Sequence, residues 1–260
     1  MTKFIVIASG KGGVGKTTTV INLGSALDKF GHKAIIIDGD LYKPNIGINL
    51  GMAITPHDLH DALKGKKHIK EMVYLHSSGV KMVPGDISLK ALTNLKLEKL
   101  RDVLLDLEGA AEIVLIDSAT GLSRDTLLVI KAADEVIVVT NPELAAVTDA
   151  LKLIKKTEEM GVKVAGIVVN KVTGSKLELP IKNIQSMLGK KVIAVIPEDS
   201  SVKEAVKMKH PVVHSHPDSG ASIAFKKLAA YLLGERYEHS LSSKESRFEQ
   251  FLKKTGFKSK

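Results

Sequence analysis

The fold of this chain is decided by the stretch Gly10-Lys11-Gly12-Gly13-Val14-Gly15-Lys16-Thr17. It lies between an apolar β-branched run and a helical pattern, and its spacing matches the phosphate-binding loop G-x-x-x-x-G-K-[ST] in its required context. Glycines let backbone N–H groups turn towards phosphate oxygens, while Lys16 can reach the outer phosphates and Thr17 can bind Mg²⁺. The stretch therefore predicts a nucleotide site, whereas a simple glycine-rich turn would not explain Lys16-Thr17.

The rest of the chain alternates apolar runs with helical patterns. We expect strands over residues 3–9, 33–38, 80–83, 112–117, 135–140, 163–169 and 191–196, with helices over residues 17–30, 96–107, 144–160, 178–188 and 221–233. Near-continuous hydrophobicity in the strands is typical of a sheet covered on both faces. The predicted fold class is α/β, with a doubly wound, mostly parallel sheet of the P-loop NTPase type and a C-terminal amphipathic tail.

Composition limits the classes of protein and of site. The 260 residues are 44% hydrophobic and 26% charged, which is enough to build the core of one domain. The longest apolar runs fall far short of the ~18 residues that cross a bilayer. The absence of cysteine excludes disulfides, cysteine-ligated metal clusters and a thiol nucleophile. Because the N-terminus does not resemble a secretory signal, the expected compartment is the cytoplasm.

Charge and polarity divide the chain into three parts. The net charge is +9, carried mainly by lysine, which favours phosphate-rich surfaces without reading bases. After Gly234 the sequence becomes polar and serine-containing. We therefore expect an ATPase domain over residues 1–234, a linker over residues 235–245 and a tail over residues 246–260.

The tail has the pattern of a helix that lies in a membrane interface. On a helical projection Phe248, Phe251 and Leu252 share one face, and residues 244–260 carry a net charge of +4. The candidate residues for contact with an anionic membrane are Phe248, Phe251, Leu252, Lys253, Lys254 and Phe257. Two alternatives stay open: the phenylalanines fold back onto the domain, or the tail is a disordered basic segment for nucleic acid, which would need no phenylalanine.

Lys11 is a second lysine inside the loop, and with it the loop resembles the deviant Walker A motif of the MinD/ParA ATPases. The resemblance implies that Lys11 reaches across an ATP-bound homodimer to the partner's phosphates. On its position alone, Lys11 is equally well a solvated loop lysine. The loop residues expected to bind the cofactor are Gly10, Lys11, Gly12, Gly13, Val14, Gly15, Lys16, Thr17 and Thr18.

Carboxylates follow two further strands, where an open α/β sheet faces its nucleotide. Asp38-Gly39-Asp40 resembles the family's first switch, which implies that Asp40 orients or activates the attacking water and that Asp38 supports the metal, although Asp38 alone also fits a capping role. Asp117 follows four apolar residues, as in a Walker B motif, and Ala119 stands where the family often has proline. The expected catalytic residues are Lys11, Lys16 and Asp40, and the expected metal ligands are Thr17, Asp38 and Asp117.

Three later segments also resemble the family. Asn170-Lys171 and Pro197-Glu198-Asp199 resemble the segments that hold adenine, and an Asn amide can read the adenine edge. Standing alone, Asn170 would be a strand-end turn residue. Asn141-Pro142-Glu143 fits the family as well, without an assigned chemistry.

The resemblance covers roughly residues 1–234 and is strongest to the MinD branch. It implies an ATPase that uses ATP and Mg²⁺, dimerises on ATP, sits on the inner face of the cell membrane through its tail and positions a protein partner. A DNA-partitioning ATPase of the ParA type is the first alternative, with Lys64-Gly65-Lys66-Lys67 as the best DNA contact. The charge outside the tail is only +5, which is modest for coating DNA. A metabolic P-loop ATPase is the second alternative, but no substrate pocket is identifiable.

Overall fold

The apolar runs form one sheet in the computed structural model, which describes residues 1–235, 237, 250–252 and 255–256. The strand order is β3-β4-β2-β5-β1-β6-β7-β8, and every neighbouring pair is parallel except β3 and β4. The strands are β1 (Lys3–Ser9), β2 (Ala34–Asp38), β3 (Tyr74–Leu75), β4 (Lys81–Val83), β5 (Ile113–Thr120), β6 (Glu135–Thr140), β7 (Lys163–Val172) and β8 (Val192–Pro197). This confirms the predicted α/β class and mostly parallel sheet.

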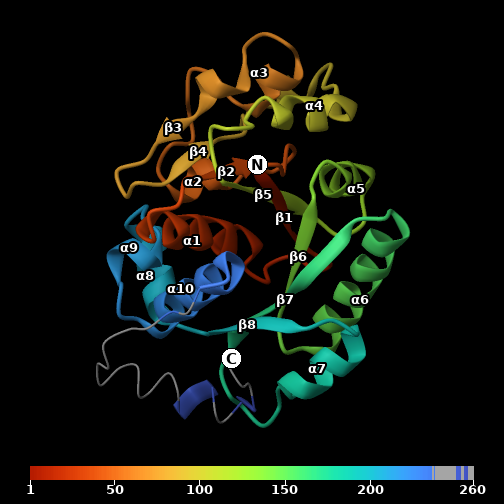
Figure 1. The fold of residues 1–260 in the computed structure, drawn as a ribbon, viewed down its shortest axis with the longest axis vertical. Coiled ribbons are helices and arrows are strands. Elements are labelled where there is room, and N and C mark those ends of the chain that lie inside the picture. Colours follow the sequence, from red (N-terminus) through yellow and green to blue (C-terminus); the bar gives the residue numbers. More distant parts are fainter. Residues whose placement is uncertain (236, 238–249, 253–254, 257–260) are drawn as a thin grey trace.

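Helices cover both faces of this sheet. In Figure 1, α1, α8, α9 and α10 lie on one side, α5, α6 and α7 lie on the other, and α3 and α4 gather beyond the β3–β4 end. The helices are α1 (Lys16–Lys29), α2 (Ile46–Asn49), α3 (Leu59–Leu63), α4 (Leu100–Leu105), α5 (Arg124–Lys131), α6 (Leu144–Glu159), α7 (Ile181–Leu188), α8 (Ser200–Lys207), α9 (Val212–Ser215) and α10 (Gly220–Leu233). Short 3-10 helices span η1 (Ile69–Met72), η2 (Leu89–Leu92) and η3 (Leu97–Lys99). The central strands are therefore buried on both sides, as their hydrophobicity predicts.

Two helix predictions need correction. The helix expected over residues 96–107 is divided into η3 and the short α4. The helix expected over residues 178–188 begins only at Ile181, because Pro180 is its N-cap and a proline disfavours helical backbone in the residue before it. Glu178 instead accepts hydrogen bonds from the backbone N–H groups of Thr173 and Gly174, at 2.8 and 2.9 Å.

Strand register brings the predicted acidic residues to one edge of the sheet. Asp117 of β5 is the register partner of both Asp38 on β2 and Ile7 on β1. Because β1 continues directly into the glycine-rich loop, the carboxyl ends of these three strands surround it. β5 continues through Ala119 to Thr120, which pairs with Ser9 after a shift in register opposite Ser118 and Ala119.

Part of the predicted tail lies against the domain. Leu252 is 3% exposed and packs with the core, and the partly buried Phe251 lies beside Gly174. Tyr237 also contacts the domain, with its ring 5.7 Å from that of Phe30. Phe248, Lys253, Lys254 and Phe257 lie outside the described residues. For Phe251 and Leu252 this is the folded-back arrangement, and not the exposed face that a membrane anchor needs.

A bilayer-spanning helix, long and apolar enough to cross, is not found among the described residues.

Candidate nucleotide site

The loop after β1 depends on glycine at a defined position. Gly15 has φ of 95°, in the left-handed region that favours glycine, and it immediately precedes α1. A Cβ at this position would lie 2.1 Å from the side-chain nitrogen of Asn170. Any other residue at position 15 would therefore strain the backbone and displace Asn170.

The base of the loop is a closed, buried cluster. The Lys16 ammonium lies 3.0 Å from Asp117 Oδ1, and the Thr17 hydroxyl donates to Asp117 Oδ2 at 2.5 Å. The side chains of Lys16 and Asp117 are 8% and 0% exposed. Burial raises the pKa of Asp117, and the charge of Lys16 and the bond from Thr17 oppose that rise. One carboxylate thus fixes both loop side chains that the motif assigns to phosphate and metal.

The first predicted switch places two acidic side chains beside this cluster. Asp38 Oδ2 accepts a hydrogen bond from the Ile46 backbone at 2.8 Å, while its buried Oδ1 has no partner among the described residues. Burial, followed by the charge of Asp117, raises the pKa of Asp38 well above its usual range. Burial also raises the pKa of Asp40, which accepts a hydrogen bond from the Lys43 backbone at 3.1 Å. Both acids are thus held next to the loop at a cost in desolvation.

These oxygen atoms fit a magnesium ion. Mg²⁺ prefers one or two carboxylates together with substrate phosphates and water. Two buried carboxylates with raised pKa values, one with an unpartnered oxygen, form a donor set that a divalent cation would neutralise. Thr17, Asp38 and Asp117 are the residues that would hold it, and when bound it would offset phosphate charge.

The rim of the loop is held by an exposed ion pair. Lys11 Nζ lies 2.8 Å from Glu143 Oε2, and the two side chains are 40% and 59% exposed. The hydrogen bond from Lys11 lowers the pKa of Glu143 below its usual range. Sequence reasoning gave Glu143 no chemistry, because its partner is distant in the chain.

The end of β7 braces the loop from the other side. The Asn170 amide donates to the Val14 carbonyl at 2.8 Å, and Lys171 Nζ donates to the Gly13 carbonyl at the same distance. Because β7 continues to Val172, Asn170 and Lys171 belong to the strand and not to a loop beyond it. Asn170 therefore shapes the phosphate loop, and its predicted adenine contact stays a prediction.

The last residue of β8 and the two residues after it have different structural roles. Pro197 pairs with Val172, and Asp199 caps α8 by accepting from Ser201 and also accepts from the Ala221 backbone, at 2.9 and 3.0 Å. Glu198 lines an open cavity of about 750 Å³ beside the loop. Other residues that line this cavity include Asn141, Glu143, Leu144, Lys171 and Leu177. Its size is that of a small-molecule site.

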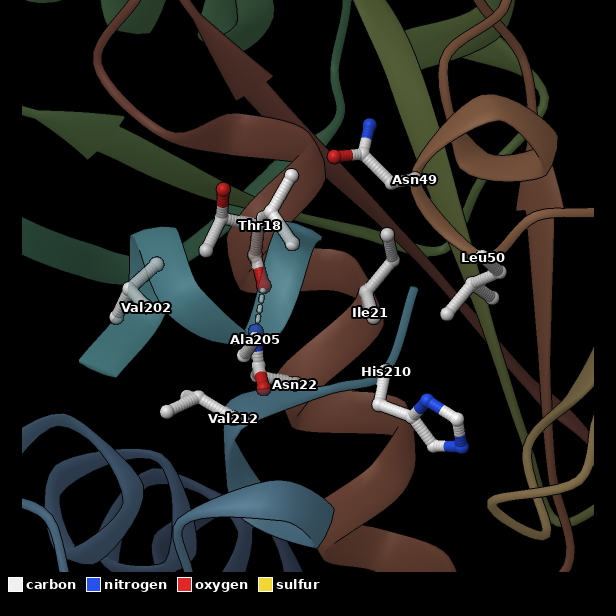
Figure 2. Close-up of a pocket in the computed structure, with 10 residues that line it drawn as sticks. Thr18, Ile21, Asn22, Asn49, Leu50, Val202, Ala205, His210 and Val212 are labelled. Atoms are coloured by element: carbon white, nitrogen blue, oxygen red, sulfur yellow. Dashed lines mark hydrogen bonds between the residues drawn. The ribbon is translucent and has the colours of Figure 1, made fainter. Parts of the chain in front are cut away.

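A second cavity lies where α1, α8 and the segments around α2 and α9 meet. Figure 2 shows Asn22 donating to the Thr18 carbonyl there, at 2.8 Å, and Asn22 Oδ1 also accepts from the Val213 backbone at 3.2 Å. The volume is only about 10 Å³, close to the minimum for one water. This cavity is a small packing gap between helices behind the loop and not a ligand site.

The predicted DNA contact is largely neutralised. Lys66 lies 2.9 Å from Asp61, and Lys67 lies 3.1 Å from Glu71. Two of the three lysines in the cluster therefore have acidic partners, which weakens the cluster's attraction for a phosphate backbone.

Comparisons with known proteins agree on one family. Residues 5–212 match the model of the CobQ/CobB/MinD/ParA nucleotide binding domain. The chain is 41% identical over 244 residues to an uncharacterized ATP-binding protein of Methanocaldococcus jannaschii, covering 94% of this chain and 92% of that one.

Solved structures give the same result. The septum site-determining protein MinD of Pyrococcus horikoshii, complexed with Mg-ADP, has a TM-score of 0.85 and 33% identity, covering 89% of this chain and 96% of that one. A MinC:MinD cell division protein complex of Aquifex aeolicus has a TM-score of 0.83 and 27% identity, covering 92% and 99%.

Proposed function

Because the chain belongs to the CobQ/CobB/MinD/ParA nucleotide-binding family, as a Mg²⁺-dependent P-loop ATPase of the MinD kind, we propose that it is an ATP-switched dimer that positions a protein partner on a membrane. The observation that carries the proposal is that the two lysines of the loop lie in opposite environments. Lys16 is buried against Asp117, whereas Lys11 stands exposed at the rim. A lysine that serves only its own phosphates has no need of that exposed position.

The nucleotide step follows from the buried cluster. Lys16 would donate to the outer phosphates, Thr17, Asp38 and Asp117 would hold the metal, and backbone N–H groups of the loop would bind the phosphate oxygens. Asp40 lies at the edge of this cluster and accepts the proton of the attacking water or orients it. Burial raises the pKa of Asp40, which makes its carboxylate a stronger proton acceptor.

The dimer step assigns Lys11 to the partner's phosphates. An exposed ammonium group at the rim can reach a second chain placed against the carboxyl ends of the strands. Its positive charge would stabilise the negative charge that develops during phosphoryl transfer. Hydrolysis is then slow in a single chain, because the site is complete only when two copies meet.

The membrane step uses the tail. In the described structure Leu252 is covered by the domain, so the apolar side chains must leave it before they can enter lipid. One such tail binds weakly, because ordering a short helix offsets much of the gain from burying Phe side chains. Two tails on one dimer act through effective concentration, so ATP controls membrane affinity without a new lipid contact.

A protein partner is the fourth part of the proposal. The similar Aquifex aeolicus MinD forms a complex with MinC, a cell division protein. For this chain we propose the same class of partner, a protein that the ATP-bound dimer recruits to the cytoplasmic face of the membrane. DNA is the less favoured surface, because Lys66 and Lys67 are already paired with acidic residues.

Sedimentation tests the membrane proposal directly. The protein is spun with anionic vesicles and, separately, with plasmid DNA, each with ATP or ADP. We expect ATP-dependent pelleting with vesicles, lost in Phe251→Glu and kept in Ile54→Glu, a control at an exposed apolar residue of the domain. ATP-dependent pelleting with DNA alone would favour the ParA-type alternative.

A stability measurement accompanies the Phe251→Glu variant. If it melts several degrees lower and loses nucleotide binding, Phe251 is a core residue and the membrane role of the tail is wrong. A variant that keeps its melting temperature while losing vesicle binding supports the anchor.

A further inference from the structure

Glu143 lies at the N-terminus of α6, but its side chain does not cap that helix. It is the N-cap residue of α6, yet its side chain accepts no capping hydrogen bond. Its carboxylate instead accepts from Lys11 at 2.8 Å. Since carboxylates at helix N-termini commonly bond to the first backbone N–H groups, this side chain is available for the loop.

The backbone holds the rim of the loop close to α6, so the fold itself places Lys11 beside Glu143. A Cβ on Gly10 would lie only 2.4 Å from the backbone of Asp149, so the chain just before Lys11 lies directly against α6. Lys171, which donates to the Gly13 carbonyl, also lowers the pKa of Glu143 through its charge, after the larger effect of Lys11. Glu143 thus faces two lysines that both belong to the phosphate-loop assembly.

We propose that Glu143 restrains Lys11 within its own chain and so sets how readily ATP brings two copies together. The inference rests on the proposed ATP-dependent dimer. Lys11 cannot bind its own Glu143 and a partner's phosphate at once, so each Lys11 must leave its carboxylate when the dimer forms. Glu143 is therefore a positioning residue that favours the single chain.

The size of the restraint follows from its exposure. Exposed ion pairs change an equilibrium constant by roughly 1.5-fold to fivefold. A symmetric dimer breaks two of them, so the dimer dissociation constant of wild-type protein should exceed that of a Glu143-neutral variant by roughly two- to 25-fold. Such a restraint delays dimerisation without preventing it.

Sedimentation with a non-hydrolysable ATP analogue tests the restraint. We expect Glu143→Gln to dimerise at a concentration roughly two- to 25-fold lower than wild type. Glu159→Gln, which removes a surface acid paired with Lys156 at the other end of α6, should leave the dimer unchanged. The gain should shrink in ~1 M salt, where the Debye length is about 3 Å. A Glu143→Gln dimer that is equal to or weaker than wild type overturns the inference.

A titration of the single chain separates this inference from the proposed function. Without nucleotide, the NMR-detected pKa of Glu143 should lie below its usual range in wild type and move back towards it in Lys11→Ala. The absence of that movement overturns the inference. A wild-type chain that stays monomeric with the ATP analogue overturns the proposed dimer, whereas a wild-type dimer that Glu143→Gln fails to strengthen overturns this inference alone.

Discussion

The phosphate loop has a buried lysine at its base and an exposed lysine at its rim. At the base, Lys16 is buried against Asp117, which also accepts a hydrogen bond from Thr17. At the rim, Lys11 is 40% exposed and is held by one carboxylate from α6. Removing one partner of a buried pair is strongly destabilising because the other charge is left uncompensated, while exposed pairs contribute little to stability. The base is thus suited to hold a phosphate group in place, and the rim is suited to switch partners.

The largest effect should come from breaking the base. Asp117→Ala leaves Lys16 buried without its counter-charge, and we expect a loss of about 3–5 kcal/mol in unfolding free energy. Urea denaturation measures it, with Glu143→Gln as the matched change at the rim. Equal losses in the two variants would remove the distinction between base and rim.

Asp40→Ala should separate chemistry from assembly. We expect ATP hydrolysis to fall roughly a hundredfold or more, as for the loss of a general base, while ATP binding and ATP-dependent dimerisation persist. Phosphate release under single-turnover conditions measures the rate, and sedimentation measures the dimer. Turnover at the wild-type rate would remove Asp40 from its assigned role.

The pH dependence of stability should report the buried acids at the base. Because the folded-state pKa of Asp38 is raised, the folded state binds a proton more tightly than the unfolded state. Stability should therefore fall as pH rises from the ordinary aspartate range towards the raised value, by at most about 1.4 kcal/mol per pH unit for one group. Asp38→Asn should flatten the slope in Mg²⁺-free denaturation. Parallel slopes in the two proteins would contradict the assignment.

The smallest effect on a single chain should come from the rim lysine. Lys11→Ala should change unfolding free energy by less than about 0.5 kcal/mol and leave monomeric nucleotide affinity nearly unchanged, because Lys11 makes only an exposed contact. The ATP-dependent dimer should nevertheless be lost. Lys16→Ala, by contrast, should lose nucleotide affinity, and an equal loss in both variants, measured by calorimetry, would end the comparison.

Much of this site could be predicted from sequence because its motifs stand at strand ends. Asp38 and Asp117 meet beside the loop since parallel strands in register bring their carboxyl ends together. The ligand-like roles of Thr17 and Lys16 follow from the loop spacing alone. These inferences need only local pattern and topology.

Other features depend on contacts that no local pattern encodes. The ion pair of Lys11 and Glu143 joins residues far apart in the chain. The strand β3 has only two residues, too few to show the alternating apolar pattern of a strand. The helix α5 has a readable start, because Ser123 caps it and Asp125 lies in its first turn, but sequence reasoning did not use that signal. Asp199 likewise accepts hydrogen bonds from the backbones of Ser201 and Ala221 at two helix N-termini, and its predicted adenine contact stays a prediction.

Gly15 and Asn170 are far apart in the sequence but lie very close together in the fold. Asn170 holds the loop from 156 residues beyond Val14. A smaller side chain at position 170 would relieve the contact that a Cβ at position 15 creates, but it would leave the backbone at φ of 95° just as strained. The dependence therefore runs one way: a change at position 170 would not make another residue acceptable at position 15, so compensating double substitutions at this pair should be rare.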